Sequence, residues 1–175
     1  MTIAIRRLTA EQTRACDGNL ADILIDCVEG GASVSFMAPL SREKAQAFWS
    51  EIIDGVASGA RALLMAQDAD SGEALGTVQL VLAQPENQPH RADLAKMLVH
   101  RRARRRGIGA MLMRSAEDIA RAAGKTLLVL DTATGSDAER LYQRLGWTRV
   151  GVIPGYALWP DGRPCATTYY FKELA

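Results

Sequence analysis

One stretch of the chain, Asp93 to Arg114, limits the possible folds more than any other. A short apolar run, Leu94 to Val99, precedes an arginine-rich segment that contains Gly107 and Gly109, and apolar residues then recur at helical spacing. The pattern predicts a buried strand that leads through a basic turn into a helix. The first backbone N–H groups of a helix lack intrahelical partners and lie at the positive end of its dipole. We therefore expect this junction to bind the phosphate groups of a ligand.

The glycine spacing of the turn distinguishes between families of phosphate-binding loops. The Rossmann fingerprint requires a third glycine where this chain has Leu112, and a Walker A loop requires a Gly-Lys-Ser/Thr triplet that is absent here. Residues 104–109 fit instead the Arg/Gln-x-x-Gly-x-Gly/Ala signature of the GNAT superfamily of N-acetyltransferases. They resemble the loop that holds the pyrophosphate of acetyl-coenzyme A in that superfamily. With the next residue, the loop consists of Arg104, Arg105, Arg106, Gly107, Ile108, Gly109 and Ala110.

The positive charge of this loop is a local feature of the sequence. The whole chain has 21 Lys and Arg against 20 Asp and Glu, a formal net charge of +1. Nucleic-acid-binding domains usually have a strongly basic balance, so this composition argues against a nucleic-acid partner. Coenzyme A carries a pyrophosphate and a ribose phosphate, and a compact cluster of guanidinium groups suits these anions without making the whole protein basic.

Length and composition predict one soluble domain. A chain of 175 residues with 48% hydrophobic content can bury one substantial core and is short for two, so we expect a single domain over residues 1–175. No apolar run approaches the ~20 residues of a membrane span, and no signal-peptide pattern follows Arg7. We therefore expect a cytoplasmic protein with no membrane association. The three cysteines form no Cys-x-x-Cys pair and the two histidines have no partner at metal-ligand spacing, so we predict no metal.

Periodicity and turn residues predict the remaining elements in the order β-α-α-β-β-β-α-β-α-β-β. The expected strands cover residues 2–8, 61–67, 74–83, 93–99, 126–131, 147–152 and 167–171, and the expected helices cover residues 10–29, 41–59, 108–124 and 136–146. This order predicts an α/β fold with one sheet of mixed direction and helices on both faces. The strand at 126–131 is a continuous apolar run ending in Asp131, so we expect it to be fully buried, with its carboxyl end at a ligand crevice.

The order of elements is similar to the GNAT fold over nearly the whole chain. That resemblance implies a mostly antiparallel sheet whose two central strands splay apart. Two segments outside the phosphate loop, Gly30 to Met37 and Pro154 to Arg163, resemble superfamily members that acetylate an amine on a β-lactam amino acid toxin. The resemblance implies acetyl-coenzyme A as the acetyl donor, a small amino acid-like amine as the acceptor, direct transfer in a ternary complex and a role in antibiotic resistance. The protein is expected to be a monomer or a homodimer.

Acetyl transfer from a thioester to an amine needs a base for the ammonium group and an acid for the departing thiolate. Asp93 and Asp131, at the ends of neighbouring strands, are the carboxylates best placed to act as the base. The resemblance implies that Tyr142 is the general acid beside the coenzyme A sulfur. A core role for Tyr142, and a surface or substrate-orienting role for each carboxylate, are the alternatives. The resemblance also implies contacts between coenzyme A and Met97, Leu98, Val99 and Ser136.

Two other functions remain open at this point. A non-catalytic acyl-coenzyme A sensor would keep the loop at 104–109 and lose the acid and the base, so the presence of Tyr142, Asp93 and Asp131 argues against it. An acetyltransferase that modifies proteins or peptides would keep all of these residues. It differs from an enzyme with a small-molecule acceptor in whether peptides or free amino acids drive the release of coenzyme A.

Overall fold

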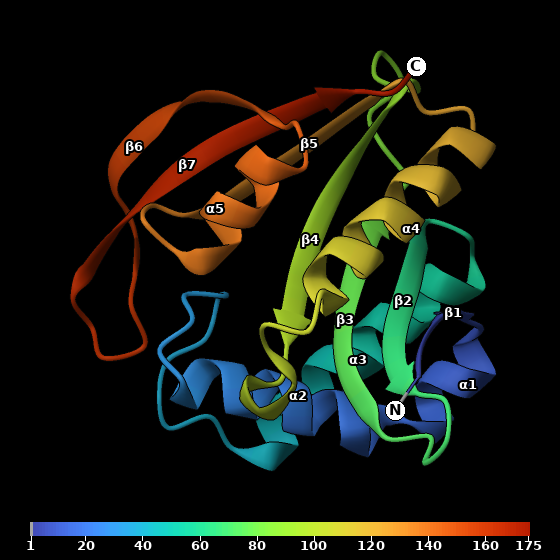
Figure 1. The fold of residues 1–175 in the computed structure, drawn as a ribbon, viewed down its shortest axis with the longest axis vertical. Helices are drawn as coiled ribbons and strands as arrows, with labels where there is room; N and C mark the ends of the chain where they lie inside the picture. Colours follow the sequence, from blue (N-terminus) through green and yellow to red (C-terminus); the bar gives the residue numbers. More distant parts are fainter. Residues whose placement is uncertain (1) are drawn as a thin grey trace.

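A seven-stranded sheet forms the centre of the computed structural model, which describes residues 2–175 (Figure 1). The strand order is β1-β2-β3-β4-β5-β7-β6, and every neighbouring pair is antiparallel except β4 and β5. This confirms the predicted α/β fold with one mixed, mostly antiparallel sheet. The strands are β1 (Ile3–Leu8), β2 (Arg61–Asp68), β3 (Ala74–Val81), β4 (Arg91–Val99), β5 (Leu127–Ala133), β6 (Thr148–Leu158) and β7 (Pro164–Glu173).

Helices cover both faces of the sheet. In β2, Leu63 and Met65 belong to one buried cluster with α2 and α3, whereas Leu64 belongs to a second cluster with α4. Figure 1 shows α4 and α5 on the near face and α1 to α3 behind the sheet. No helix in the described part of the chain is long and apolar enough to cross a membrane. The helices are α1 (Ala10–Ala15), α2 (Asp17–Glu29), α3 (Arg42–Ala57), α4 (Ile108–Ala122) and α5 (Asp137–Arg144), with a 3₁₀ turn, η1 (Arg101–Ala103).

Local signals placed most of the helix ends correctly. Ser41 and Ser136 cap α3 and α5 with their hydroxyl oxygens, as predicted, and Gly146 adopts the left-handed conformation after α5. The prediction of a single helix over residues 10–29 was wrong, because the chain breaks at Cys16 between α1 and α2. The apolar periodicity behind that prediction begins only at Leu20, so it belongs to α2 alone.

Two strand predictions also need correction. The strand at 126–131 was expected to be fully buried, but in β5 only Leu128 and Leu130 are buried, and Asp131 is exposed. One face of β5 is covered by the core, and the other borders an open part of the molecule. The strand predicted at 147–152 continues to Leu158 through Pro154, which is tolerated because β6 is an edge strand and its register shifts there.

Candidate active site

The site is organised by the divergence of β4 and β5. These parallel strands pair only from Arg91–Leu127 to Asp93–Val129. Beyond that point β4 remains paired with β3 and β5 remains paired with β7, and Figure 1 shows the two strands separating. The predicted splaying of the central strands is therefore present. The gap leaves the carboxyl-terminal half of β4 without a neighbouring strand on that side, as a ligand that lies along a strand edge requires.

A β-bulge in β4 lies at this gap. Gln79 pairs with Ala95 and Thr77 pairs with Leu98, so two β4 residues, Lys96 and Met97, lie opposite one β3 residue. Lys96 has a φ of 51°, in the left-handed region that residues with a Cβ rarely adopt. Of the predicted contact residues, the side chain of Leu98 is buried in the core, and those of Met97 and Val99 are half-buried.

The predicted phosphate loop lies between β4 and α4. Gly107 has a φ of 78° and is the N-cap of α4, and no side chain caps this helix end. Arg104, Arg105 and Arg106 are exposed around it. The N–H groups of the first turn of α4 are therefore uncapped by side chains and surrounded by guanidinium groups, which suits a pyrophosphate.

Two further predicted contact residues have structural roles, one in helix packing and one in helix capping. A Cβ atom at Gly109 would lie 2.8 Å from Cδ2 of Leu141, so the absence of a side chain lets α4 approach α5 closely. The Ser136 hydroxyl accepts a hydrogen bond from the backbone N–H of Glu139 at 3.2 Å. Ser136 thus fixes the start of α5, and the other predicted residues of the loop, Ile108 and Ala110, begin α4.

Tyr142 on α5 is buried, with 5% of its surface exposed. Its ring lies near Trp147 and Tyr170, with centroid distances of 6.1 and 6.2 Å. Among residues 2–175, no hydrogen bond joins its hydroxyl to another residue, whereas the Tyr170 hydroxyl donates to Glu139 and accepts from Gln143. Burial, assisted by the charge of Asp131, raises the pKa of the Tyr142 hydroxyl well above its ordinary range. The Tyr142 hydroxyl is therefore protonated and available as a donor, and the charge of Asp131 acts on it.

The two predicted bases have different surroundings. Asp93 is paired with Arg91 and also accepts a hydrogen bond from Nε2 of Gln84 at 3.3 Å. The Asp131 side chain has no hydrogen bond or ion pair with another described residue. The surrounding protein raises the pKa of Asp131 by desolvation, and the positive charge of Lys96 opposes that rise. Asp131 is nevertheless solvent-accessible, so an acceptor amine can approach it.

Lys96 was not recognised as a site residue from the sequence. Its Nζ donates a hydrogen bond to the Ser35 hydroxyl at 2.9 Å and lies 5.8 Å from the centroid of the Phe48 ring. Desolvation lowers the pKa of the Lys96 ammonium group, and the negative charge of Asp131 opposes this effect. A lysine within the apolar run of β4 was the only sequence signal, and the bulge at which it lies depends on strand pairing.

Tyr169 and Tyr156 border Asp131 on the side of the β6–β7 hairpin. Tyr169 is the register partner of Asp131 across β5 and β7, so both side chains are on one face of the sheet. The Tyr169 hydroxyl donates to the Tyr156 hydroxyl at 2.9 Å. That bond, then burial and the charge of Asp131, raise the pKa of Tyr169 to about 12. The two tyrosine side chains therefore lie beside the Asp131 carboxylate.

The two segments that carried the finer resemblance lie side by side. The Ser33 hydroxyl donates to the carbonyl of Leu158 at 2.7 Å, and the backbone N–H of Ala38 donates to the carbonyl of Pro160 at 3.1 Å. These bonds join the α2–α3 loop to the β6–β7 turn. A hollow of about 230 Å³ lies between them, lined in part by Gly31 and Trp159. The hydrogen bond from Lys96 to Ser35 also places the α2–α3 loop beside the β4 bulge.

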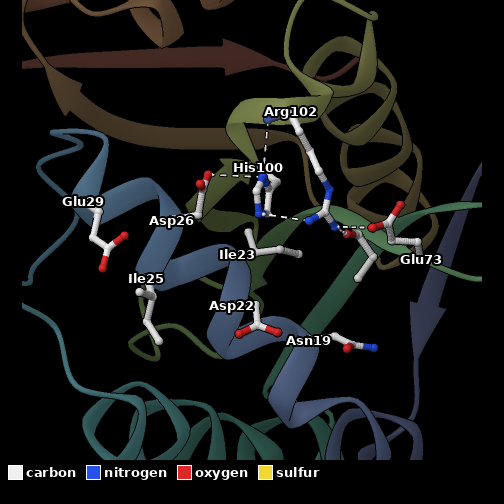
Figure 2. Close-up of a pocket in the computed structure, with 10 residues that line it drawn as sticks. Asn19, Asp22, Ile23, Ile25, Asp26, Glu29, Glu73, His100 and Arg102 are labelled. Atoms are coloured by element: carbon white, nitrogen blue, oxygen red, sulfur yellow. Dashed lines mark hydrogen bonds and ion pairs between the residues drawn. The ribbon is translucent and has the colours of Figure 1, made fainter.

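A hollow of about 410 Å³ lies elsewhere, between α2, the start of β3 and the end of β4 (Figure 2). Its lining includes four carboxylates, from Asp22, Asp26, Glu29 and Glu73, which would repel phosphate groups. Asp26 accepts hydrogen bonds from the backbone N–H and Nε of Arg101, at 2.7 and 2.9 Å. Burial acts to raise the pKa of Asp26, but these bonds and His100 hold it below its ordinary value. This cluster anchors the end of β4 to α2 and so positions the phosphate loop.

Metal ligands are not grouped in the described chain. Within residues 2–175, no set of three or more His, Cys, Asp or Glu side chains is arranged to hold a metal ion.

Comparison with known proteins identifies the family. The model of the acetyltransferase (GNAT) family matches residues 30–147. Among solved structures, a Salmonella typhimurium protein assigned as an acetyltransferase and solved with its cofactor acetyl-CoA has a TM-score of 0.78 at 19% identity, over 100% of this chain and 95% of that one. A protein assigned as a phosphinothricin N-acetyltransferase has a TM-score of 0.79 at 17% identity, over 99% of both chains.

A third similar structure is the ribosomal-protein-alanine N-acetyltransferase of Brucella melitensis, with a TM-score of 0.77 at 22% identity, over 98% of this chain and 99% of that one. These likenesses extend the shared fold over essentially the whole chain. The family match covers the bulge, the phosphate loop, α4, β5 and Tyr142. The chain therefore belongs to the acetyltransferase (GNAT) family and is an N-acetyltransferase.

Proposed function

We propose that this protein transfers the acetyl group of acetyl-coenzyme A directly to the amine of a small, amino acid-like acceptor. The observation that carries the proposal is the divergence of β4 and β5: the strands stop pairing after Asp93 and Val129, two residues before Asp131, and β4 then leads through the arginine-rich loop to the start of α4. In this arrangement the pyrophosphate lies on residues 104–110 and the pantetheine arm lies along Met97 to Val99. The acetyl group then reaches the point where β4 and β5 separate.

The proposed chemistry divides between the two sides of the gap. Asp131 accepts the proton of the acceptor ammonium, directly or through water, and the free amine attacks the thioester carbonyl. The C–N bond forms as the C–S bond breaks, Tyr142 gives its proton to the departing thiolate, and the second proton of the attacking nitrogen passes through solvent to the Tyr142 phenolate. The raised pKa of Tyr142 keeps it protonated at neutral pH, although it also makes it a weaker acid than a free phenol. Asp93, paired with Arg91, is assigned a supporting charge near the entrance rather than the base.

A small acceptor is supported by the segments that close the site. Gly30 to Met37 and Pro154 to Arg163 resemble those of tabtoxin resistance protein, and the hydrogen bonds of Ser33 and Ala38 bring these segments together. One structural neighbour is assigned as a phosphinothricin N-acetyltransferase, which supports an acceptor of the amino acid type. Another neighbour acts on a ribosomal protein, so the same fold also serves protein acceptors, and acetylation of a protein is the second candidate function.

Acetyl-coenzyme A is expected to raise the melting temperature of the protein. A ligand that binds only the folded state stabilises it by ~2.7 kcal/mol at a hundredfold excess over Kd. The matched variants are Gly107→Asn and Gly107→Asp, because both side chains tolerate the left-handed conformation of Gly107 and differ mainly in charge. The shift should persist in the Asn variant and be much smaller in the Asp variant, because a carboxylate repels phosphate. Equal shifts in both variants, or none in the parent protein, would contradict the proposed phosphate site.

Free amino acids are expected to drive the release of coenzyme A more effectively than peptides or polyamines. The assay measures free thiol with acetyl-coenzyme A and a panel of amines, and tabtoxinine-β-lactam is the first compound to test. Turnover with peptides alone would retain the N-acetyltransferase activity and replace the acceptor with a protein. Turnover with polyamines alone would contradict an amino acid-like acceptor, because these amines carry no carboxylate.

A further inference from the structure

Lys96 has hydrogen-bonding capacity that the described protein does not use. An ammonium group can donate three hydrogen bonds, and the Lys96 Nζ donates one, to the Ser35 hydroxyl. No carboxylate oxygen among residues 2–175 lies within 4.0 Å of it. The side chain is half-buried beside Phe48, where an unpaired charge is unfavourable. A ligand oxygen is the natural partner for the remaining donors.

Asp131 has the complementary arrangement on the opposite side of the gap. It too lacks a side-chain partner among the described residues, and it interacts electrostatically with Lys96 without forming an ion pair. Desolvation opposes the charged form of both groups. The acceptor side of the gap therefore presents one positive and one negative group that do not neutralise each other through direct contact.

A zwitterionic amino acid matches this pair of charges. Its ammonium group can lie beside Asp131 while its carboxylate lies on the Lys96 ammonium group. A polyamine would meet the positive charge of Lys96 without offering it an anion. The amine at the N-terminus of a peptide lacks the adjacent carboxylate, because that carboxyl group is part of an amide bond.

We infer that Lys96, held in place by the Ser35 hydroxyl, is the binding subsite for the carboxylate of an amino acid acceptor. This inference rests on the proposed function and makes it more specific, because it identifies the acceptor as a zwitterion with its carboxylate close to the acetylated amine. The left-handed backbone at Lys96 supports it, since the β4 bulge directs this side chain away from the regular strand pattern. Lys96 is a specificity residue in this scheme, and Asp131 retains the role of base.

The test compares free L-amino acids with their carboxamides, which have the same side chain and amine but no anionic group. The parent protein should favour the acid that it acetylates best over the matching amide by ~10–100-fold in kcat/KM, the range expected for charged hydrogen bonds. Lys96→Met should bring the acid down to the level of its amide, mainly through a higher KM for the acid. The KM for acetyl-coenzyme A should stay unchanged. Lys96→Arg should restore part of the preference, because it keeps the charge.

Lys44→Met is the matched control, since Lys44 is an exposed lysine in the first turn of α3. It should leave the preference for the acid intact. Equal turnover of acids and amides by the parent protein would overturn the carboxylate subsite while leaving acetylation of small amines in place. A preference for acids over amides that survives Lys96→Met would also overturn the carboxylate subsite. If the protein acetylates peptides and uses neither free amino acids nor their carboxamides, both this inference and the proposed function are overturned.

Discussion

Replacing Tyr142 with phenylalanine is expected to lower kcat by ~10²–10⁴-fold, the usual contribution of a positioned general acid. The substitution keeps the ring that packs near Trp147 and Tyr170, so the core should change little. It removes only a hydroxyl that has no hydrogen-bond partner among the described residues. The departing thiolate would then lack its donor. Steady-state rates should therefore fall while the affinity for acetyl-coenzyme A stays nearly the same.

Tyr170→Phe provides a control in the neighbouring ring. The Tyr170 hydroxyl donates to Glu139 and accepts from Gln143, so it has the structural role that Tyr142 lacks. Its removal should cost ~1 kcal/mol of stability and leave kcat largely unchanged. If Tyr142→Phe instead loses stability and keeps a rate within threefold of the parent, its role is structural, and solvent water is the proton source for the thiolate.

Replacing Asp131 with asparagine is expected to lower kcat by on the order of 10²-fold or more at neutral pH, because the acceptor ammonium group loses its base. The direction of the pH dependence follows from the pKa. Desolvation raises the pKa of Asp131, with Lys96 opposing and Asp93 adding to the rise. The parent enzyme should therefore lose activity as the pH falls through a value above the ordinary aspartate pKa. The Asn variant should lack this acid limb.

Stability should follow a different course from the rate. Because the folded-state pKa of Asp131 is raised, its favourable contribution to folding is fully present below the unfolded pKa and is lost as the pH rises through the folded pKa. At neutral pH the charged form is therefore unfavourable for folding, and Asp131→Asn should leave the melting temperature unchanged or raise it. Asp93→Asn is the comparison, because Asp93 is paired with Arg91. A larger loss of kcat in the Asp93 variant, with the acid limb kept in the Asp131 variant, would reverse the two roles.

The sequence alone determined those parts of the protein whose signals are local. The apolar run of β4, Gly107 and the helical periodicity of α4 identified the strand, the phosphate loop and the helix, because each follows from residues close together in the chain. The caps at Ser41 and Ser136 were predicted for the same reason. Family resemblance and strand order together gave the mixed sheet and the splayed central strands. Periodicity failed at the break between α1 and α2, where it was extended beyond its residues, and the apolar run of β5 did not make that strand fully buried.

Tertiary structure decided which side chains lie together at the β4–β5 gap. Ser33 and Leu158 are 125 residues apart in the chain, and the bond between them places the α2–α3 loop against the end of β6. Lys96 enters the proposed acceptor subsite through the pairing of β3 with β4, which produces the bulge. Asp93 and Asp131 looked equivalent as strand-end carboxylates, and the contacts of Arg91 and Gln84 with Asp93 distinguished them. Pairing, register and desolvation depend on residues distant in the sequence, so no local pattern could have determined them.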